Sequence, residues 1–187
     1  MRRGFKAEAK KLALELREEL GADAHVPFDP YTFARNYGID VVELSTLDTE
    51  ARHHFLKADG SPFSGALIPV GTGMVILEND AQPKARRRTT MCHEIAHVVL
   101  EHSFGISFAD ERKCGLGGDQ ENEADWLSGE MLIPYDGAFR LARANAPDGQ
   151  VAGVFDVSLA VARWRMNSSG ARRVAQRARA KWAGNRR

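Results

Sequence analysis

The chain has 187 residues, of which 43% are hydrophobic and 27% are charged, and its formal net charge is +1. This length and composition predict a globular protein with one main hydrophobic core and exclude an intrinsically disordered chain. The sequence has no run of about 20 apolar residues, and its N-terminal stretch lacks the apolar core of a signal peptide, so we expect a cytoplasmic protein without a membrane span.

Helices are predicted to begin the chain. Apolar residues recur with helical spacing over residues 5–20. Asp29 and Pro30 are typical of an N-cap and a first helical residue, so a second helix is predicted from there. Residues 39–44 are predicted to form a short strand.

An antiparallel hairpin is predicted over residues 63–78, with its turn at Gly71-Thr72-Gly73. His53 and His54 come before it, in a segment expected to be extended. A helix is predicted over about residues 83–101 after the hairpin.

The second half of the chain is predicted to be helical. Asp119 is a good N-cap for a helix that should end before Pro134. Further helices are expected at 135–144, 150–155, 158–166 and 171–182. We predict two domains, a main one over residues 1–146 and a small helical region, similar to a helix-turn-helix, over residues 147–187 with a basic tail.

The motif His93-Glu94-Ile95-Ala96-His97 falls in the helix predicted at 83–101. Residues four apart lie on one face of a helix, so the two imidazoles can bind one Zn²⁺. Glu94 points elsewhere and can take a proton from a metal-bound water. The alternative is a pair of ordinary histidines on a half-buried helix.

A catalytic zinc needs a third protein ligand and one open position. Glu123 is followed by Leu127 and Met131 at steps of four, so its carboxylate is predicted on the core-facing side of its helix. A carboxylate there needs a partner, which a metal supplies. The alternative partner is one of the many arginines.

Other possible ligands fit less well. His102 follows the motif too closely and is expected at the surface or beside a ligand. Cys92 is expected to be a small buried residue, and Cys114, in a glycine-rich loop, could approach the metal in a resting state.

The stretch His93–His102, followed by Glu121–Pro134, resembles the ImmA/IrrE-type metallopeptidases. Weaker similarities lie upstream, around Asp29-Pro30 and Arg86–Thr89, and downstream, around Phe155–Ser158. The resemblance implies an α+β, zincin-like metallopeptidase core, in which a small antiparallel sheet packs on the HExxH helix and on a second helix that carries the glutamate. The C-terminal part would be helical.

The resemblance implies that His93, His97 and Glu123 bind zinc and that Glu94 is the general base. Mn²⁺ and Fe²⁺ also suit two histidines and a carboxylate. Asp125 is a candidate to orient a ligand. Tyr135 or His54 are candidates to stabilise the oxyanion.

The resemblance further implies a protein substrate, typically a separate helix-turn-helix repressor, whose cleavage would release a stress, mobile-element or phage programme. Two alternatives remain open. The chain could bind a regulator without cutting it, keeping a metal site. It could also bind DNA through its C-terminal region, because nine Lys and Arg and no acidic residue follow Asp156. The alternative explanation of that basic stretch is a solvated helix face.

Overall fold

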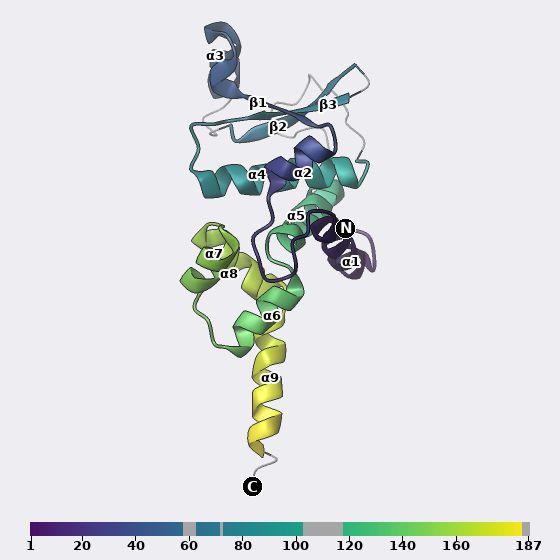
Figure 1. The fold of residues 1–187 in the computed structure, drawn as a ribbon, viewed down its shortest axis with the longest axis vertical. Helices are drawn as coiled ribbons and strands as arrows, with labels where there is room; N and C mark the ends of the chain where they lie inside the picture. Colours follow the sequence, from purple (N-terminus) through teal and green to yellow (C-terminus); the bar gives the residue numbers. More distant parts are fainter. Residues whose placement is uncertain (58–62, 72, 103–117, 185–187) are drawn as a thin grey trace. The chain divides into compact units, whose positions relative to one another are not determined.

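The computed structural model describes residues 1–57, 63–71, 73–102 and 118–184 (Figure 1). The chain forms two compact units, each assembled from two stretches of sequence: Met1–Lys6 with Asp29–Ser128, and Ala7–Phe28 with Gly129–Arg187. The domain boundary expected between residues 146 and 147 falls inside the second unit. The predicted two-domain division stays a prediction.

The first unit contains a three-stranded sheet in the order β1-β3-β2. β2 (Gly65–Val70) pairs antiparallel with β3 (Gly73–Glu78), which confirms the predicted hairpin. β1 (Asp40–Glu43) pairs with β3 in parallel, so the sheet is mixed and the expectation of an antiparallel sheet is wrong. The reason is the long connection between β1 and β2, which allows β1 to run in the same direction as β3.

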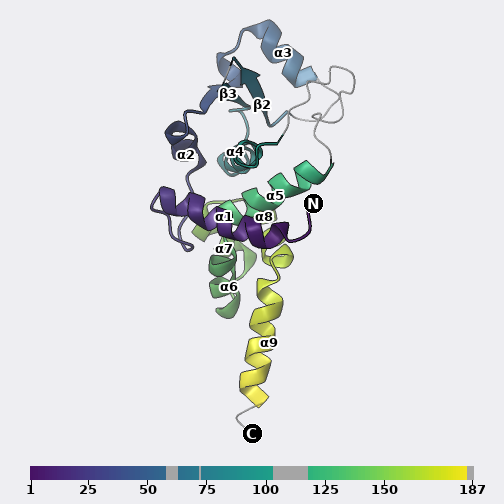
Figure 2. The ribbon, with the colours of Figure 1, turned by 90° about the vertical axis from the view of Figure 1, so that its right-hand side faces the viewer.

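Helix α4 (Lys84–Val99) packs against β2 and β3 (Figures 1 and 2). The sheet contributes Leu67, Ile76 and Leu77 to the core of the first unit, and α4 contributes Met91 and Ile95. Leu67 and Ile76 lie on the face of the sheet that Gly65 presents to Thr90 of α4, so the sheet and α4 form two layers with apolar side chains between them. Their close approach fixes the position of α4 relative to β2.

Strand β2 lies at an edge of the described sheet, because only β3 pairs with it among the described strands. Residues Gly65, Leu67 and Pro69 alternate with Ala66 and Ile68 along it. In antiparallel pairs the backbone groups of alternate residues point to opposite sides of the strand. The backbone N–H of Leu67 bonds to Glu94 of α4, so Gly65, Leu67 and Pro69 direct their backbone groups away from β3.

The histidines before the hairpin lie in a helix, α3 (Thr49–Lys57), so the expectation of an extended segment is wrong. The side chain of Asp48 accepts a hydrogen bond from the backbone N–H of Ala51 at 2.8 Å, as an N-cap does. In both views α3 lies on the opposite side of the sheet from α4 (Figures 1 and 2).

Helix α2 (Pro30–Asn36) begins as predicted. The Asp29 carboxylate accepts a hydrogen bond from the backbone N–H of Tyr31 at 3.1 Å, and Pro30 occupies the first turn. α2 packs on α4 and β1. The remaining elements of this unit are the 3₁₀ helix η1 (Leu44–Thr46) and most of α5 (Gly118–Leu132).

The second unit is helical and confirms the helices expected from the sequence. It contains α6 packed on α9 and α7 packed on α8. The guanidinium of buried Arg17 donates to the backbone carbonyl of Met131 at 2.5 Å, and that of buried Arg165 to the carbonyl of Ile133 at 3.0 Å. Its helices are α1 (Phe5–Glu19, which begins in the first unit), α6 (Tyr135–Arg143), α7 (Asp148–Phe155), α8 (Leu159–Ser168) and α9 (Ala171–Gly184).

None of the helices over the described ranges is both long enough and apolar enough to cross a membrane.

Candidate metal centre

Helix α4 carries the HExxH motif in the part of the helix that packs against the sheet. Met91, Cys92 and Ile95 are buried and fix one face of the helix in the core. His97 is also buried, whereas His93 and Glu94 are half-buried. The burial of Cys92 agrees with its expected role as a small core residue. The motif therefore sits at the border between the core and the surface.

His93 and His97 meet the carboxylate of Glu121, which extends from the first turns of α5. The two Nε2 atoms are 3.1 Å apart. Glu121 Oε2 lies 3.2 Å from Nε2 of His93, and Oε1 lies 3.6 Å from Nε2 of His97. Ligand atoms on a tetrahedral Zn²⁺ with bonds of about 2.0–2.1 Å are about 3.3 Å apart. The three side chains therefore have the spacing that one cation requires.

The electrostatics of the two rings also suit a cation. Burial lowers the pKa of His93, but its contacts with Asp125 and Glu121 outweigh burial and raise this pKa to about 10. Burial and the nearby His93 lower the pKa of His97. Two bare ring nitrogens 3.1 Å apart would repel, so the pair shares a proton or a cation. The donor set of two imidazoles and a carboxylate fits zinc.

Each imidazole has a second contact through its Nδ1 atom. Asp125 Oδ1 lies 3.1 Å from Nδ1 of His93. His102 Nδ1 lies 2.8 Å from Nδ1 of His97. Such contacts fix the tautomer and the ring orientation of a metal-binding histidine, because the outer nitrogen holds the proton and the inner one is free to bind.

His102 reaches His97 because of the way α4 ends. The backbone N–H groups of Glu101 and His102 bond to the carbonyls of Val98 and His97 at 3.0 and 3.1 Å, and Glu101 has a positive φ of 50°. This is the Schellman arrangement, which brings the residue after the turn back onto the last helical turn. His102 is therefore buried against His97 instead of lying along a continued helix.

Glu94 lies beside His93 and is half-buried at the surface of the same helix. Burial raises the pKa of its carboxyl, and the charge of Glu121 raises it further. The charge of His93 and a hydrogen bond from the backbone N–H of Leu67 act in the opposite direction. The net effect is a raised pKa, which makes the carboxylate a better proton acceptor.

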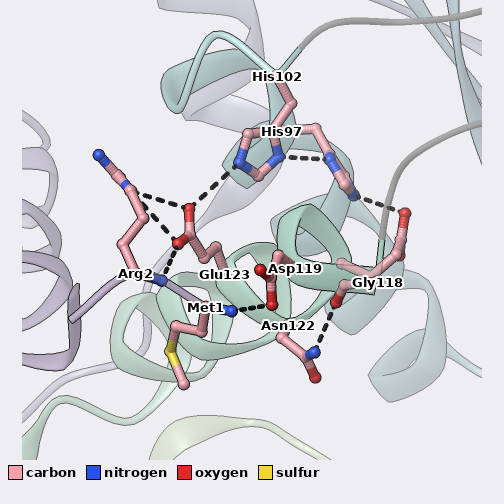
Figure 3. Close-up of polar contacts among 9 residues, drawn as sticks. Met1, Arg2, His97, His102, Gly118, Asp119, Asn122 and Glu123 are labelled. Carbon is pink, nitrogen blue, oxygen red and sulfur yellow. Dashed lines mark hydrogen bonds and ion pairs between the residues drawn. The ribbon is translucent and has the colours of Figure 1, made fainter.

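Glu123, the third ligand expected from the sequence, faces away from the two α4 imidazoles. It accepts a hydrogen bond from the backbone N–H of Arg2 at 2.7 Å and lies 3.2 Å from the Arg2 guanidinium (Figure 3). Its other neighbour is His102, 3.8 Å away (Figure 3). Residues two apart on a helix point about 200° apart, so Glu121 and Glu123 cannot both face the same cation.

The other expected site residues are distributed as follows. Asp125 lies against His93. Tyr135 belongs to the second unit, where its ring stacks on Phe139 with the ring centroids 6.0 Å apart. His54 lies in α3, but its side chain is outside the described residues, and so is Cys114.

A cavity of about 280 Å³ opens beside His93 and Glu94. It extends from the motif toward the beginning of β2, and Ser64, Gly65, Arg86 and Thr90 are among its other lining residues. A Cβ atom on Gly65 would lie 2.6 Å from Cγ2 of Thr90, so a glycine at this position allows β2 to approach α4 closely.

Sequence reasoning did not identify Glu121 as the carboxylate beside the two imidazoles. It placed His102 either at the surface or beside a ligand, and the structure has it buried beside His97. A signal for Glu121 was present, because it opens the same Glu-x-Glu segment as Glu123. His102 gave no clear signal, since a glycine usually marks the Schellman turn and glutamate occupies it here.

Residues 34–167 match the family profile Peptidase_M78, described as IrrE N-terminal-like domain. The matched stretch is more than half of the 187 residues and contains all of α4 and α5. A search of curated proteins gave no significant match.

Proposed function

The chain belongs to the family of IrrE N-terminal-like domain peptidases, and from this premise we propose that it is a metal-dependent endopeptidase. The observation that carries the proposal is the convergence of His93, His97 and Glu121 at distances of 3.1–3.6 Å, with Glu94 beside them. These three side chains would hold the metal. When bound, Zn²⁺ would supply Lewis acidity, which lowers the pKa of water toward about 7 and polarises a carbonyl.

Glu94 is the proposed general base. Its half-buried carboxylate would accept the proton of the attacking water and deliver it to the leaving amine. The hydrogen bond from the Leu67 backbone holds this carboxylate in place, at the edge of β2. Asp125 and His102 would orient the two imidazoles, since each contacts the Nδ1 atom of one ring.

The substrate is proposed to lie extended along the outer edge of β2. Backbone groups of Gly65 and Leu67 point to this edge, and a peptide added there would pass the cavity beside Glu94. An extended segment places its backbone carbonyls near the motif at regular intervals.

We propose a helix-turn-helix repressor as the protein substrate, in regulation of a stress response or of a mobile element. The support for this choice is the resemblance of the motif segments to the ImmA/IrrE-type metallopeptidases. The first repressor to test as a substrate is one whose gene lies next to the gene of this protein.

The test incubates that repressor with the zinc-loaded protein and follows cleavage by mass spectrometry. We expect cleavage that stops with a chelator and stops in Glu94→Gln, while that variant still binds zinc and the repressor. Glu50→Gln, at an exposed position of α3, serves as the matched control and should cut normally.

Cleavage by Glu94→Gln at the normal rate would refute the assigned base. A repressor that binds but stays intact under every metal condition would instead favour the regulator-binding alternative.

A further inference from the structure

The cavity beside the motif has a cationic end. Arg86 lies in the first turns of α4, where its exposed side chain lines the same cavity as His93 and Glu94. Its guanidinium contacts Ser64, with Nε and Nη2 at 3.4 and 3.1 Å from the hydroxyl oxygen. The end of the cavity away from the motif therefore carries a guanidinium group.

The contact with Ser64 uses only part of the N–H donors of the Arg86 guanidinium. A guanidinium has five N–H donors and matches a carboxylate in a bidentate geometry. Within the described ranges no carboxylate lies within 4.0 Å of Arg86, and Ser64 offers one neutral oxygen. Its neighbour Arg87 contrasts with it, because Arg87 contacts Glu78 at 2.6 Å and Glu43 at 3.1 Å. Arg87 is paired within the fold, whereas the contacts of Arg86 over the described residues leave donors for an outside group.

The position of Arg86 sets how far from the reaction that group would bind. Arg86 precedes His93 by seven residues, which is about 10 Å along a helix at about 1.5 Å per residue. An extended peptide advances about 3.3 Å per residue, so this distance corresponds to about three residues.

We propose that Arg86, held by Ser64, forms a subsite that selects an Asp or Glu side chain about three residues from the scissile bond. This inference rests on the proposed peptidase function and adds a preference to it. Arg86 is the cationic side chain that lines this cavity away from the proposed metal site, so it is the group that would pair with an acidic substrate side chain.

The first experiment profiles cleavage of a proteome-derived peptide library by the zinc-loaded protein, read by mass spectrometry. Asp and Glu should be enriched about fivefold two to four residues from the cut, the size expected for an exposed ion pair. Arg86→Ala should remove the enrichment, and Arg86→Glu should replace it with Lys and Arg.

Arg35→Ala is the matched control. Arg35 is also exposed in the first unit and also donates to a hydroxyl, that of Thr32 at 2.8 Å, but it does not line the cavity. Its cleavage profile should equal that of the unmodified protein. Circular dichroism of each variant checks that the fold is intact.

The second experiment separates the subsite from the reaction. Zinc-loaded Glu94→Gln, with and without Arg86→Ala, selects from a displayed library of random dodecapeptides. Acidic peptides retained only when Arg86 is present, without cleavage by the unmodified protein, would support the subsite and count against the peptidase. Cleavage with no acidic preference, or with the same preference in Arg86→Ala, would overturn the subsite and leave the peptidase. Neither cleavage nor acidic retention would overturn both.

Discussion

Replacing Glu121 with glutamine should weaken zinc binding at least about 100-fold. Loss of a residue that only orients a ligand costs about 10–100-fold in metal affinity, and loss of a direct ligand should cost more. Glu121 lies 3.2 and 3.6 Å from the Nε2 atoms of His93 and His97, so its carboxylate is the acidic group that would bind the same cation. A factor of 100 corresponds to about 2.8 kcal/mol of binding free energy.

Glu123→Gln is the matched variant, because the substitution is identical and two residues away. Glu123 reaches the centre only through His102, at 3.8 Å, so its loss should cost about tenfold or less. Competition with a chromophoric chelator at fixed pH measures the affinity of both variants, and circular dichroism confirms that each is folded.

The ranking decides between two ligand sets. A larger loss of affinity in Glu123→Gln than in Glu121→Gln would show that Glu123 binds the metal, as the family resemblance implies. The contact of Glu123 with Arg2 would then have to break when metal binds.

Three further predictions concern the surroundings of the site and the second unit. His102→Ala should weaken zinc binding about 10–100-fold because His97 loses its Nδ1 partner, whereas His53→Ala, at an exposed position, should not; chelator competition compares them. Gly137→Ala should destabilise the fold by about 3 kcal/mol, since the new Cβ would lie 2.2 Å from the Ala24 carbonyl oxygen, and a normal melting temperature would contradict the packing. Asp148→Asn should cost about 1 kcal/mol at pH 7. The Arg172 contact lowers the pKa of Asp148, so its contribution is present above about pH 4 and is lost as pH falls through the lowered pKa. Thermal unfolding should therefore show a difference at pH 7 that shrinks as the pH is lowered below about 4.

Features encoded by neighbouring residues were predictable from the sequence. The start of α2 follows from Asp29 and Pro30, whose side chain and ring act within one helical turn. The hairpin of β2 and β3 follows from two short apolar runs on either side of Gly71-Thr72-Gly73. In each case the signal and its effect lie within a few residues of each other, so no tertiary information is needed.

The partner of the Glu123 carboxylate could not be predicted from neighbouring residues. Its helical spacing correctly indicated burial, and only 5% of it is exposed. Burial requires a polar partner but does not identify it. The partner is Arg2, which lies 121 residues away in the sequence, and no local pattern connects the two.

The sequence did not decide between a surface position and a position beside a ligand for His102, and the reason is local. Helix α4 ends at Val99, and the turn that follows brings His102 back onto His97. A positive φ at a glutamate is unusual, and propensity gives no warning of it. The direction of one side chain therefore depended on a single backbone torsion angle.

Pro69 limits what the edge of β2 can pair with. An edge strand with free N–H groups is a template for self-association into larger sheets. Proline has no N–H to donate, and the N–H of Leu67 is already bonded to Glu94. Between residues 65 and 69, Gly65 is thus the one residue whose outward N–H remains for an incoming strand. Only a short pairing at the Gly65 end of the strand is therefore favourable. Leu67 and Pro69, which offer no free outward N–H, should also protect the protein against edge-to-edge aggregation.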